Sequence, residues 1–394
     1  MSDTLSPDDV LRMRVHALGL AENGWTGAEQ EHRGIGGERT GAVVRRMLAL
    51  QGQDWRSARW ALGIRAPGTT VEDVEASFTE RRIVRSWPMR GTVHIVASED
   101  IRWMQLATNH RVLAGAPKRR AFLGITDALL DRLVDTSMLA LGAAGSSGLD
   151  REELGRAWTD AGLEWQSNWR YHLIWWICQN GLAAFGPIGP AGEPLLVAAE
   201  HWIPAHRDVT GDAALRELAT RYAAARGPIR EKDLAWWTGL TVAEARVGIS
   251  AAVDSGSLVQ VRSRDANGED VPGAAGKLWV DPALLGTPSR DAPLPEWLLL
   301  AAFDEHLLGY SDRAPQLDSA HFSRIVPGRN GMFLPTVVHR GRVVGTWKRQ
   351  RTKAGGLGID PFPEAQIDTD ALAEANRTWA AFHGVAAGDV ALIE

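Results

Sequence analysis

Residues 212 to 280 hold the most restrictive pattern in the chain, an ordered series of helices and strands. ALRELATRYAAA and IREKDLAWWTG predict two helices, and Thr241 with Glu244 forms a capping box that begins a third. LVQVR and KLWV are typical of strands, and they flank the Gly- and Asp-rich loop SRDANGEDVPGAAG. Helix, helix, turn, helix and hairpin is the order of a winged-helix domain.

The same order occurs twice more towards the N-terminus. One copy has a capped helix at 150–162, a helix at about 168–179, and the strands LAAFGP and LLVAA around IGPAGEP. The other has WRSARWALG, a helix that Thr70 begins, and the strands IVRSWP and TVHIVA. The copies show no fixed period, which indicates related domains rather than a solenoid. Hairpins are therefore expected near 83–96, 182–199 and 258–280.

Two segments before these copies carry weaker signals. ERTGAVVRRMLAL places its apolar residues on one helical stripe, and we expect this helix to end at Gln51. GIGGERTG, residues 34–41, follows no strand and lacks the Lys-Ser/Thr ending of a phosphate-binding loop. A flexible linker is the expected structure there.

The pattern changes after residue 287. MFLPTVV and GRVVGTW predict short strands around a turn at His339, Arg340 and Gly341. DTDALAEANRTWAAFHG predicts a tail helix that docks through Leu372 and Trp379 or stays partly loose. The expected fold is mainly α with β-hairpins (α+β): tandem winged-helix domains and a C-terminal β-rich subdomain. The predicted domains are 1–122, 123–208, 209–286 and 287–394.

Composition supports a large globular protein of the cytoplasm. The 394 residues are 45% hydrophobic, enough for two or three domains with buried cores. No secretion signal and no apolar run long enough to cross a membrane is found, so we expect no membrane association. The single cysteine, Cys178, lies in the apolar run LIWWICQNG, where a core position is expected. Of the seventeen tryptophans, we expect most to be core residues as well.

Charge distribution points to DNA more than the net charge of -5 does. Residues 324–353 contain eight Lys and Arg side chains and no acid. This stretch is either a phosphate-binding face or a set of solvated strand ends. The predicted DNA-binding residues are Arg81, Arg82, Lys118, Arg119, Arg120, Arg340, Arg342, Lys348, Arg349 and Arg351.

Most common catalytic patterns are missing. Cysteine and histidine do not occur at metal-ligand spacing, so we expect no metal and no other cofactor. The histidines, His94 in TVHIV among them, are scattered, and each alone is more often a structural residue than a base.

Several segments in order resemble the AlkZ/YcaQ-like winged-helix DNA glycosylases. They are LALQGQDWRSARWALGIR, RSWPMRGTVHIVASEDI, GPIREKDLAWWTGL, FDEHLLGYSDR and GMFLPTVVHRGRVVGTWKR. The resemblance covers roughly residues 8 to 350, and it implies three winged helices in a C-shaped body with a basic concave channel. It also implies a catalytic Gln-hydrophobic-Gln motif, whose glutamines fall on Gln51 and Gln53. The departure is Gly52, where the family usually has a hydrophobic residue.

The implied substrate is double-stranded DNA that carries alkylated bases, and the implied enzyme is a monomeric, monofunctional glycosylase for N7-alkylguanine, bulky adducts or interstrand crosslinks. An N7-alkylated guanine is cationic and leaves readily, so amide oxygens suffice to place water and stabilise the sugar cation. His94 and Asp54 are possible auxiliary residues, although Asp54 is more simply the cap of the helix from Trp55. A noncatalytic winged-helix DNA-binding protein, such as a regulator, is the alternative, and so is a family member that has lost catalysis.

Overall fold

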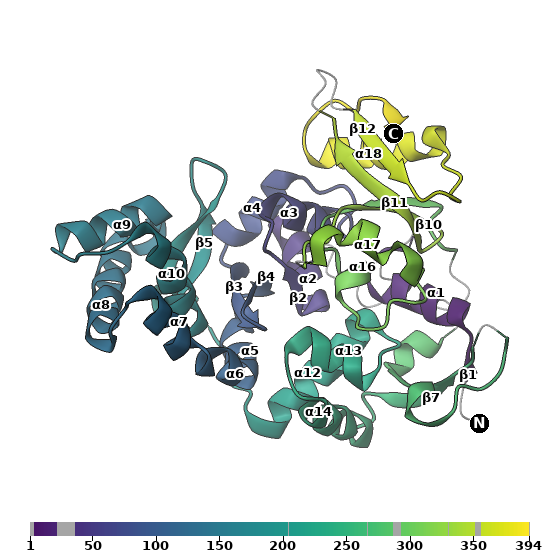
Figure 1. The fold of residues 1–394 in the computed structure, drawn as a ribbon, viewed down its shortest axis with the longest axis horizontal. Helices are drawn as coiled ribbons and strands as arrows, with labels where there is room; N and C mark the ends of the chain where they lie inside the picture. The colour runs from purple at the N-terminus through teal and green to yellow at the C-terminus, as the bar shows by residue number, and fades with distance from the viewer. Residues whose placement is uncertain are drawn as a thin grey trace.

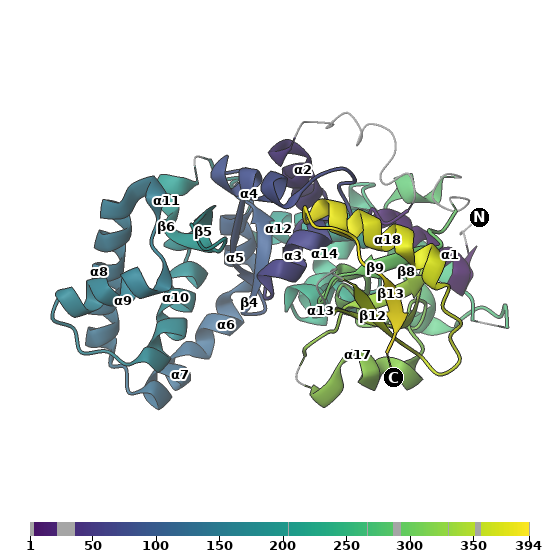
Figure 2. The ribbon, with the colours of Figure 1, turned by 90° about the horizontal axis from the view of Figure 1, so that it is seen from above.

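The structure is a computed structural model that describes residues 4–21, 36–203, 205–265, 267–286, 293–329, 331–350 and 356–393. Its outline is concave: a lobe of helices α7 to α10 stands apart from a larger body, and α5 and α6 lie between them (Figure 1). The view from above shows the same separation (Figure 2). Among the described residues, no helix has the length and apolar character needed to cross a membrane. The expected α+β fold and C-shaped body are confirmed.

Two of the expected hairpins join into one sheet. The strand order is β2-β4-β3-β5-β6, and all of its neighbours are antiparallel. The strands are β2 (Ala49–Gln51), β3 (Ile83–Met89), β4 (Thr92–Ala97), β5 (Ala183–Ile188) and β6 (Pro194–Ala198). Both hairpins lie where the sequence predicted them. Their union into a single sheet connects the first and second helix-hairpin units directly.

The helices of each unit lie beside the strands of that unit. Those of the first unit and its connection are α2 (Gly37–Met47), α3 (Trp55–Gly63), α4 (Val71–Thr79), α5 (Ile101–Thr108), α6 (His110–Ala114) and α7 (Ala116–Leu123). Those of the second are α8 (Asp127–Ala144), α9 (Arg151–Asp160), α10 (Arg170–Gln179) and α11 (Ala199–Trp202). The predicted capping boxes of α4 and α9 are present. Cys178 is buried in the core of the second unit, as expected.

The third unit has the predicted order of elements. It contains α12 (Gly211–Arg226), α13 (Glu231–Thr238), α14 (Val242–Asp254), β7 (Val259–Ser263) and β8 (Lys277–Val280). A short N-terminal strand, β1 (Thr4–Leu5), adds to β7 in parallel, and α1 (Pro7–Ala17) follows it behind the predicted Ser6 cap. Apolar residues of β1 and α1 share a core with β7 and β8. The N-terminal segment therefore packs on the third hairpin, far along the chain.

The C-terminal region is a second five-stranded sheet with the order β13-β12-β11-β10-β9. Its strands are β9 (Trp297–Leu300), β10 (Thr336–His339), β11 (Arg342–Arg349), β12 (Leu357–Pro361) and β13 (Val390–Leu392), with the short helices α16 (Glu305–Leu308) and α17 (Phe322–Ile325) between β9 and β10. The tail helix α18 (Thr369–Phe382) docks on this region, because Leu372 and Trp379 are both buried. The predicted turn between β10 and β11 is also confirmed.

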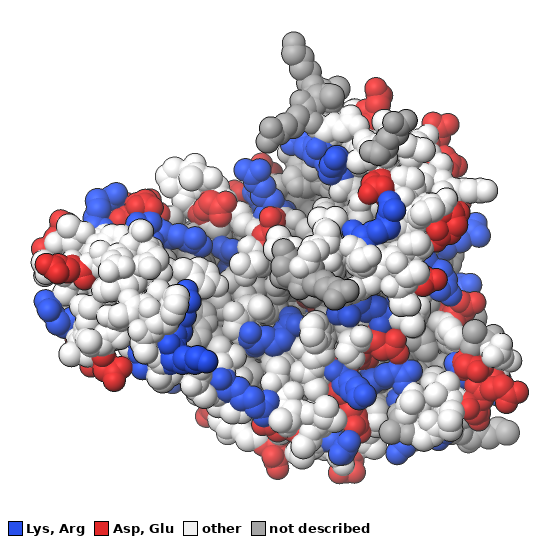
Figure 3. Space-filling view, in the orientation of Figure 1, with Lys and Arg blue, Asp and Glu red and all other residues white. Residues whose placement is uncertain are grey.

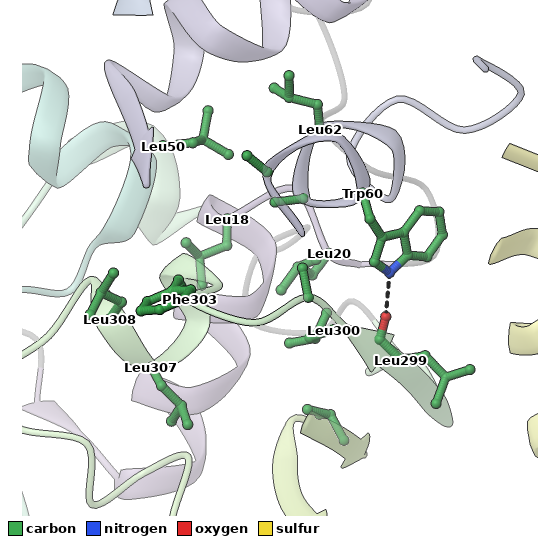
Figure 4. Close-up of a cluster of buried hydrophobic side chains, with 14 of the residues drawn as sticks. Leu18, Leu20, Leu50, Trp60, Leu62, Leu299, Leu300, Phe303, Leu307 and Leu308 are labelled. Carbon is green, nitrogen blue, oxygen red and sulfur yellow. Dashed lines mark hydrogen bonds between the residues drawn. The ribbon is translucent and has the colours of Figure 1, made fainter. Parts of the chain in front are cut away.

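This sheet shares one core with the first unit. Figure 4 shows Leu50, Trp60 and Leu62 of the first unit near Leu299 and Phe303. The Trp60 indole donates a hydrogen bond of 2.7 Å to the carbonyl of Leu299. The segments on either side of the Gln-Gly-Gln sequence are thus held by packing against distant residues, such as Leu299, 239 positions from Trp60.

Two local predictions were wrong. Helix α2 begins at Gly37 and ends at Met47, so part of the expected linker is helical, whereas residues 34 and 35 lie outside the described residues. Leu48 adopts a φ of 63°, which no right-handed helix contains, and the chain then enters β2. The ladder bonds to β4 replace the helical ones, because this apolar segment gains more by completing the sheet. Gln51 therefore ends a strand and not a helix.

Candidate active site

Gln51 is the last residue of the edge strand β2, and it is almost fully buried. It lies opposite His94 of β4 in the antiparallel register, so the two side chains share one face of the sheet. The Gln51 side-chain oxygen Oε1 is buried and has no hydrogen-bond partner among the described residues. Gln179 Oε1 and Asn376 Oδ1 are likewise unpaired among the described residues, so Gln51 Oε1 is one of several buried amide oxygens that can accept a further hydrogen bond.

A buried ion pair holds the main chain of β2. The guanidinium of Arg226 donates to the carbonyls of Met47 and Ala49, both at 2.9 Å, and to Glu305 Oε2 at 2.8 Å. Glu305 Oε1 in turn accepts the backbone N–H of Gln51 at 3.2 Å. Both charged side chains are almost completely inaccessible to solvent. Arg226 and Glu305 therefore fix the position of the strand that ends in Gln51.

Gly52 continues the hydrogen-bond ladder between β2 and β4, and the close approach of β4 leaves little space for a side chain there. Its N–H donates to the carbonyl of Val93 at 2.8 Å. A Cβ at this position would lie 3.1 Å from the carbonyl carbon of His94 and 3.2 Å from its Cα. Because these are main-chain atoms of a paired strand, they cannot rotate away. The close approach of β4 explains a glycine here.

Gln53 and Asp54 lie in a different environment from Gln51. Both are exposed, and both line a cavity of about 590 Å³ between α3 and the β5–β6 hairpin. One Asp54 carboxylate oxygen accepts the N–H of Ser57 at 2.7 Å and thereby caps α3, as the sequence predicted. The guanidinium of Arg85 donates to the carbonyl of Gly52 at 2.8 Å and to that of Gln53 at 3.4 Å.

His94 is fully buried and neutral at physiological pH. Burial, followed by the nearby Arg90 charge, lowers the pKa of its imidazole to about 3. Its Nδ1 lies 2.9 Å from the carbonyl of Thr92, which can only accept, so Nδ1 carries the proton and Nε2 is a free acceptor. Nε2 has no partner among the described residues, and neither has the hydroxyl of Ser86, the residue opposite His94 on β3. Ser86, His94 and Gln51 therefore form a row of buried polar side chains across three strands.

The predicted DNA-binding residues are distributed over several elements. Many are engaged in surface ion pairs: Arg82 with Glu38 and Glu80, Arg120 with Asp127, Arg340 with Glu296, and Arg342 with Asp8. Arg81 lies over the Trp202 ring and Arg119 over Phe122, while Lys118 on α7 is exposed. Lys348 and Arg349 are exposed on β11, whereas Arg351 lies outside the described residues. Figure 3 shows Lys and Arg side chains along both borders of the hollow between the α7–α10 lobe and the body.

No group of three His, Cys, Asp or Glu side chains is placed to hold a metal ion within the described part of the chain. The polar groups that do converge near Gln51 and Gln53 are amides, a neutral imidazole, guanidinium groups and carboxylates such as Glu305 and Asp54. Such groups can orient water and stabilise charge.

Known proteins with related sequences identify the family. The family model of AlkZ-like DNA glycosylases matches residues 44–382. This chain belongs to the AlkZ-like DNA glycosylase family. It is 24% identical over 335 residues to the interstrand DNA cross-link repair glycosylase of Streptomyces sahachiroi, which covers 82% of this chain and 85% of that protein. The solved structure of the DNA glycosylase AlkZ of Streptomyces sahachiroi has the same fold, with a TM-score of 0.75 at 21% identity over 99% of this chain and 100% of that chain.

Within this AlkZ-like chain, sequence reasoning did not single out the residues that support Gln51 and Gln53. Arg85, Arg226 and Glu305 lie in apolar or helical segments, and only tertiary contacts show that they reach β2. A charged residue in an otherwise buried strand, as Arg85 is in IVRSWP, was the one available signal.

Proposed function

We propose that this protein is a monofunctional DNA glycosylase that hydrolyses the N-glycosidic bond of N7-alkylguanine in duplex DNA. Family membership supports the reaction class. The observation that carries the assignment to Gln51 and Gln53 is the clamped end of β2, where Gln51 has an unpaired buried Oε1 and Gln53 faces a cavity. Gln51 ends the clamped strand and Gln53 follows it at the border of the cavity, and a rigid support of this kind is what preorganised catalysis needs.

The reaction needs mainly a correctly placed water molecule and stabilisation of the sugar cation. Alkylation at N7 gives the leaving guanine a positive charge, so no strong general acid is needed. The amide oxygens of Gln51 and Gln53 stabilise the oxocarbenium-like sugar and position the attacking water. Asp54 does not serve as the base in this proposal, because its carboxylate caps α3. His94 acts as a neutral acceptor near Gln51 through Nε2, while its single proton stays on Nδ1.

The relative from Streptomyces sahachiroi is named for interstrand cross-link repair. We extend the proposed substrates of this chain to bulky adducts and interstrand crosslinks on that basis. The hollow between the lobe and the body, seen in Figure 3, is where a duplex would bind in this proposal. Double-stranded DNA would bind as substrate to a monomer, through phosphate contacts from the basic residues at the borders of the hollow. We also propose that the chain consists of four domains, residues 1–122, 123–208, 209–286 and 287–394.

Incubation of the pure protein with duplex DNA that contains N7-methylguanine tests the activity. Release of the free base with formation of an abasic site supports a glycosylase, and strand cleavage without added base or amine would contradict monofunctional hydrolysis. DNA binding without release from several adducts, including a crosslinked duplex, would favour a noncatalytic DNA-binding protein.

A further inference from the structure

The cavity beside Gln53 is bordered by two units of the fold. Residues 53–56 at the start of α3 form one wall, and residues 149–152 at the start of α9 and 189–195 of the β5–β6 hairpin form the others. The Trp55 indole donates to the carbonyl of Gly192 at 2.7 Å and so joins the hairpin to α3. The first turns of two helices therefore border one cavity, and because Asp54 and Asp150 already cap them, attraction for an anion comes from the arginine side chains.

Arg85 supplies a buried positive charge to this cavity. Its side chain is 7% exposed and lies over the Phe185 ring at 5.4 Å. No carboxylate lies within ion-pair distance of its guanidinium among the described residues, and its hydrogen bonds go to the main-chain carbonyls of Gly52 and Gln53. Burial lowers its pKa to about 10, which leaves it charged at neutral pH. Glu193 and Asp54 act on this charge from beyond ion-pair distance, and a buried guanidinium without a directly paired carboxylate is unfavourable.

Arg151 adds a second free guanidinium at the same cavity. It lies 5.9 Å from the Phe185 ring, on the same ring as Arg85, and has no acidic partner in the described part of the chain. Four acids line the cavity, and three of them are engaged, whereas Glu193 has no ion-pair partner among the described residues. Asp54 and Asp150 each cap a helix at 2.7 Å, and Glu152 pairs with Arg170. The cavity therefore presents two unpaired guanidinium groups, whose geometry suits the oxygens of a phosphate.

We propose that this cavity binds a phosphodiester group of the DNA strand that carries the damaged nucleotide, with Arg85 and Arg151 as its ligands. The proposal rests on the proposed function, because it makes DNA the source of the phosphate. Arg85 would contact the phosphate and the carbonyls of Gly52 and Gln53 with one guanidinium. Arg85 is thus a positioning residue that fixes the damaged DNA strand relative to Gln53.

The test pairs protein variants with neutral phosphates in the DNA. Methylphosphonate linkages replace, one at a time, the phosphates on either side of the lesion, and affinity is measured for the full-length protein. We expect one neutral linkage to weaken wild-type binding about tenfold, as loss of a charged hydrogen bond typically does. The same linkage should have a smaller effect on Arg151→Gln than on wild type, because one of the two guanidinium partners is already gone. Arg85→Lys keeps the positive charge but loses the two parallel N–H donors of the guanidinium. The neutral linkage should therefore weaken DNA binding by this variant less than it weakens binding by wild type.

A control variant and a second ligand complete the test. Arg132→Gln removes an equally exposed charge from α8, and each linkage should weaken it as much as the wild type. If each methylphosphonate weakens wild type and Arg151→Gln equally, the proposal is overturned. A second outcome also overturns it. In that outcome every linkage is without effect, while inorganic phosphate at constant ionic strength stabilises wild type but not Arg151→Gln. The site would then bind a free anion and not DNA. Binding is read without excision, so absence of base release would reject the proposed function and leave this result standing.

Discussion

Gln51 and His94 face each other across the β2–β4 ladder, and each has a buried side-chain atom, Oε1 and Nε2 respectively, without a hydrogen-bond partner among the described residues. Unpaired buried polar atoms lower the stability of a fold, so their presence calls for an explanation such as binding or catalysis. The pair thus marks the inner end of the proposed site, as Gln53 marks its outer end. The predictions below separate these roles from purely structural ones.

Replacement of Gln51 or Gln53 by Ala should lower the excision rate by on the order of a hundredfold, the usual effect of losing one preorganised polar group. DNA affinity should change little. Single-turnover release of N7-alkylguanine from duplex DNA by wild type, each single variant and the double variant measures this. Equal rates in all four proteins would remove both residues from the mechanism.

Acid should destabilise the fold through its buried histidines. The pKa of His94 is lowered to about 3 and that of His306 to about 4, chiefly by burial. Between these values and the unfolded pKa of about 6.5, only the unfolded chain takes up the proton, so stability falls as pH falls through this window by about 1.4 kcal/mol per pH unit for each group. Urea unfolding of His94→Asn across this range should show a shallower pH dependence. The control His201→Asn, on an exposed residue, should keep the wild-type slope.

The Glu305→Gln variant should be strongly destabilised, because Arg226 then lacks its buried counter-charge. Breaking a buried pair typically destabilises by about 3–5 kcal/mol. Glu374→Gln removes a carboxylate that pairs with Arg377 on the surface, and its effect should stay below about 1 kcal/mol. Urea unfolding measures both variants. Similar midpoints for the two would show that the Arg226–Glu305 pair does not hold β2.

Gly52→Ala should lower both stability and excision. A methyl group 3.1 Å from the main chain of His94 forces β2 and β4 apart, and such overpacking typically destabilises by about 1–3 kcal/mol. This exceeds the gain of roughly 0.4–1 kcal/mol from a less flexible unfolded chain. Gly142→Ala in the last turn of α8, where a methyl group meets no atom within 4 Å, should instead be stabilising. Thermal unfolding distinguishes the two signs, and a stabilised Gly52→Ala protein would show that the ladder can yield.

DNA affinity should decrease steeply with added salt. Each phosphate contact contributes about 0.9 to the slope of log affinity against log salt concentration. Lys348 and Arg349 have no acidic partner among the described residues, so replacing both by Ala should reduce the slope by about two such contacts. Arg377→Ala, on α18, removes a charge that is paired with Glu374 and should leave the slope unchanged. An unaltered slope in the Lys348/Arg349 variant would exclude this part of β11 from the DNA interface.

Local sequence information was sufficient for most helices and all three predicted hairpins. Capping boxes at Ser6, Thr70, Asp150 and Thr241 place helix starts because the cap and its partner are three residues apart and need no distant contact. The β-branched and aromatic residues in IVRSWP and TVHIVA likewise predict β3 and β4. The family resemblance, carried by short ordered segments, selected Gln51 and Gln53 before any geometry was known.

Tertiary structure alone decided how those two glutamines are held. ALQ is equally compatible with a helix end and a strand, and pairing with β4 resolves the choice in favour of the strand. Arg226 and Glu305 are 79 positions apart in the chain, yet they meet at β2. Arg85 reaches Gly52 and Gln53 only because β3 lies one strand away from them, beyond β4. Local propensity extends over a few residues, whereas a buried charge is tolerated only where distant segments supply its partners, so these contacts could not be read from neighbouring residues.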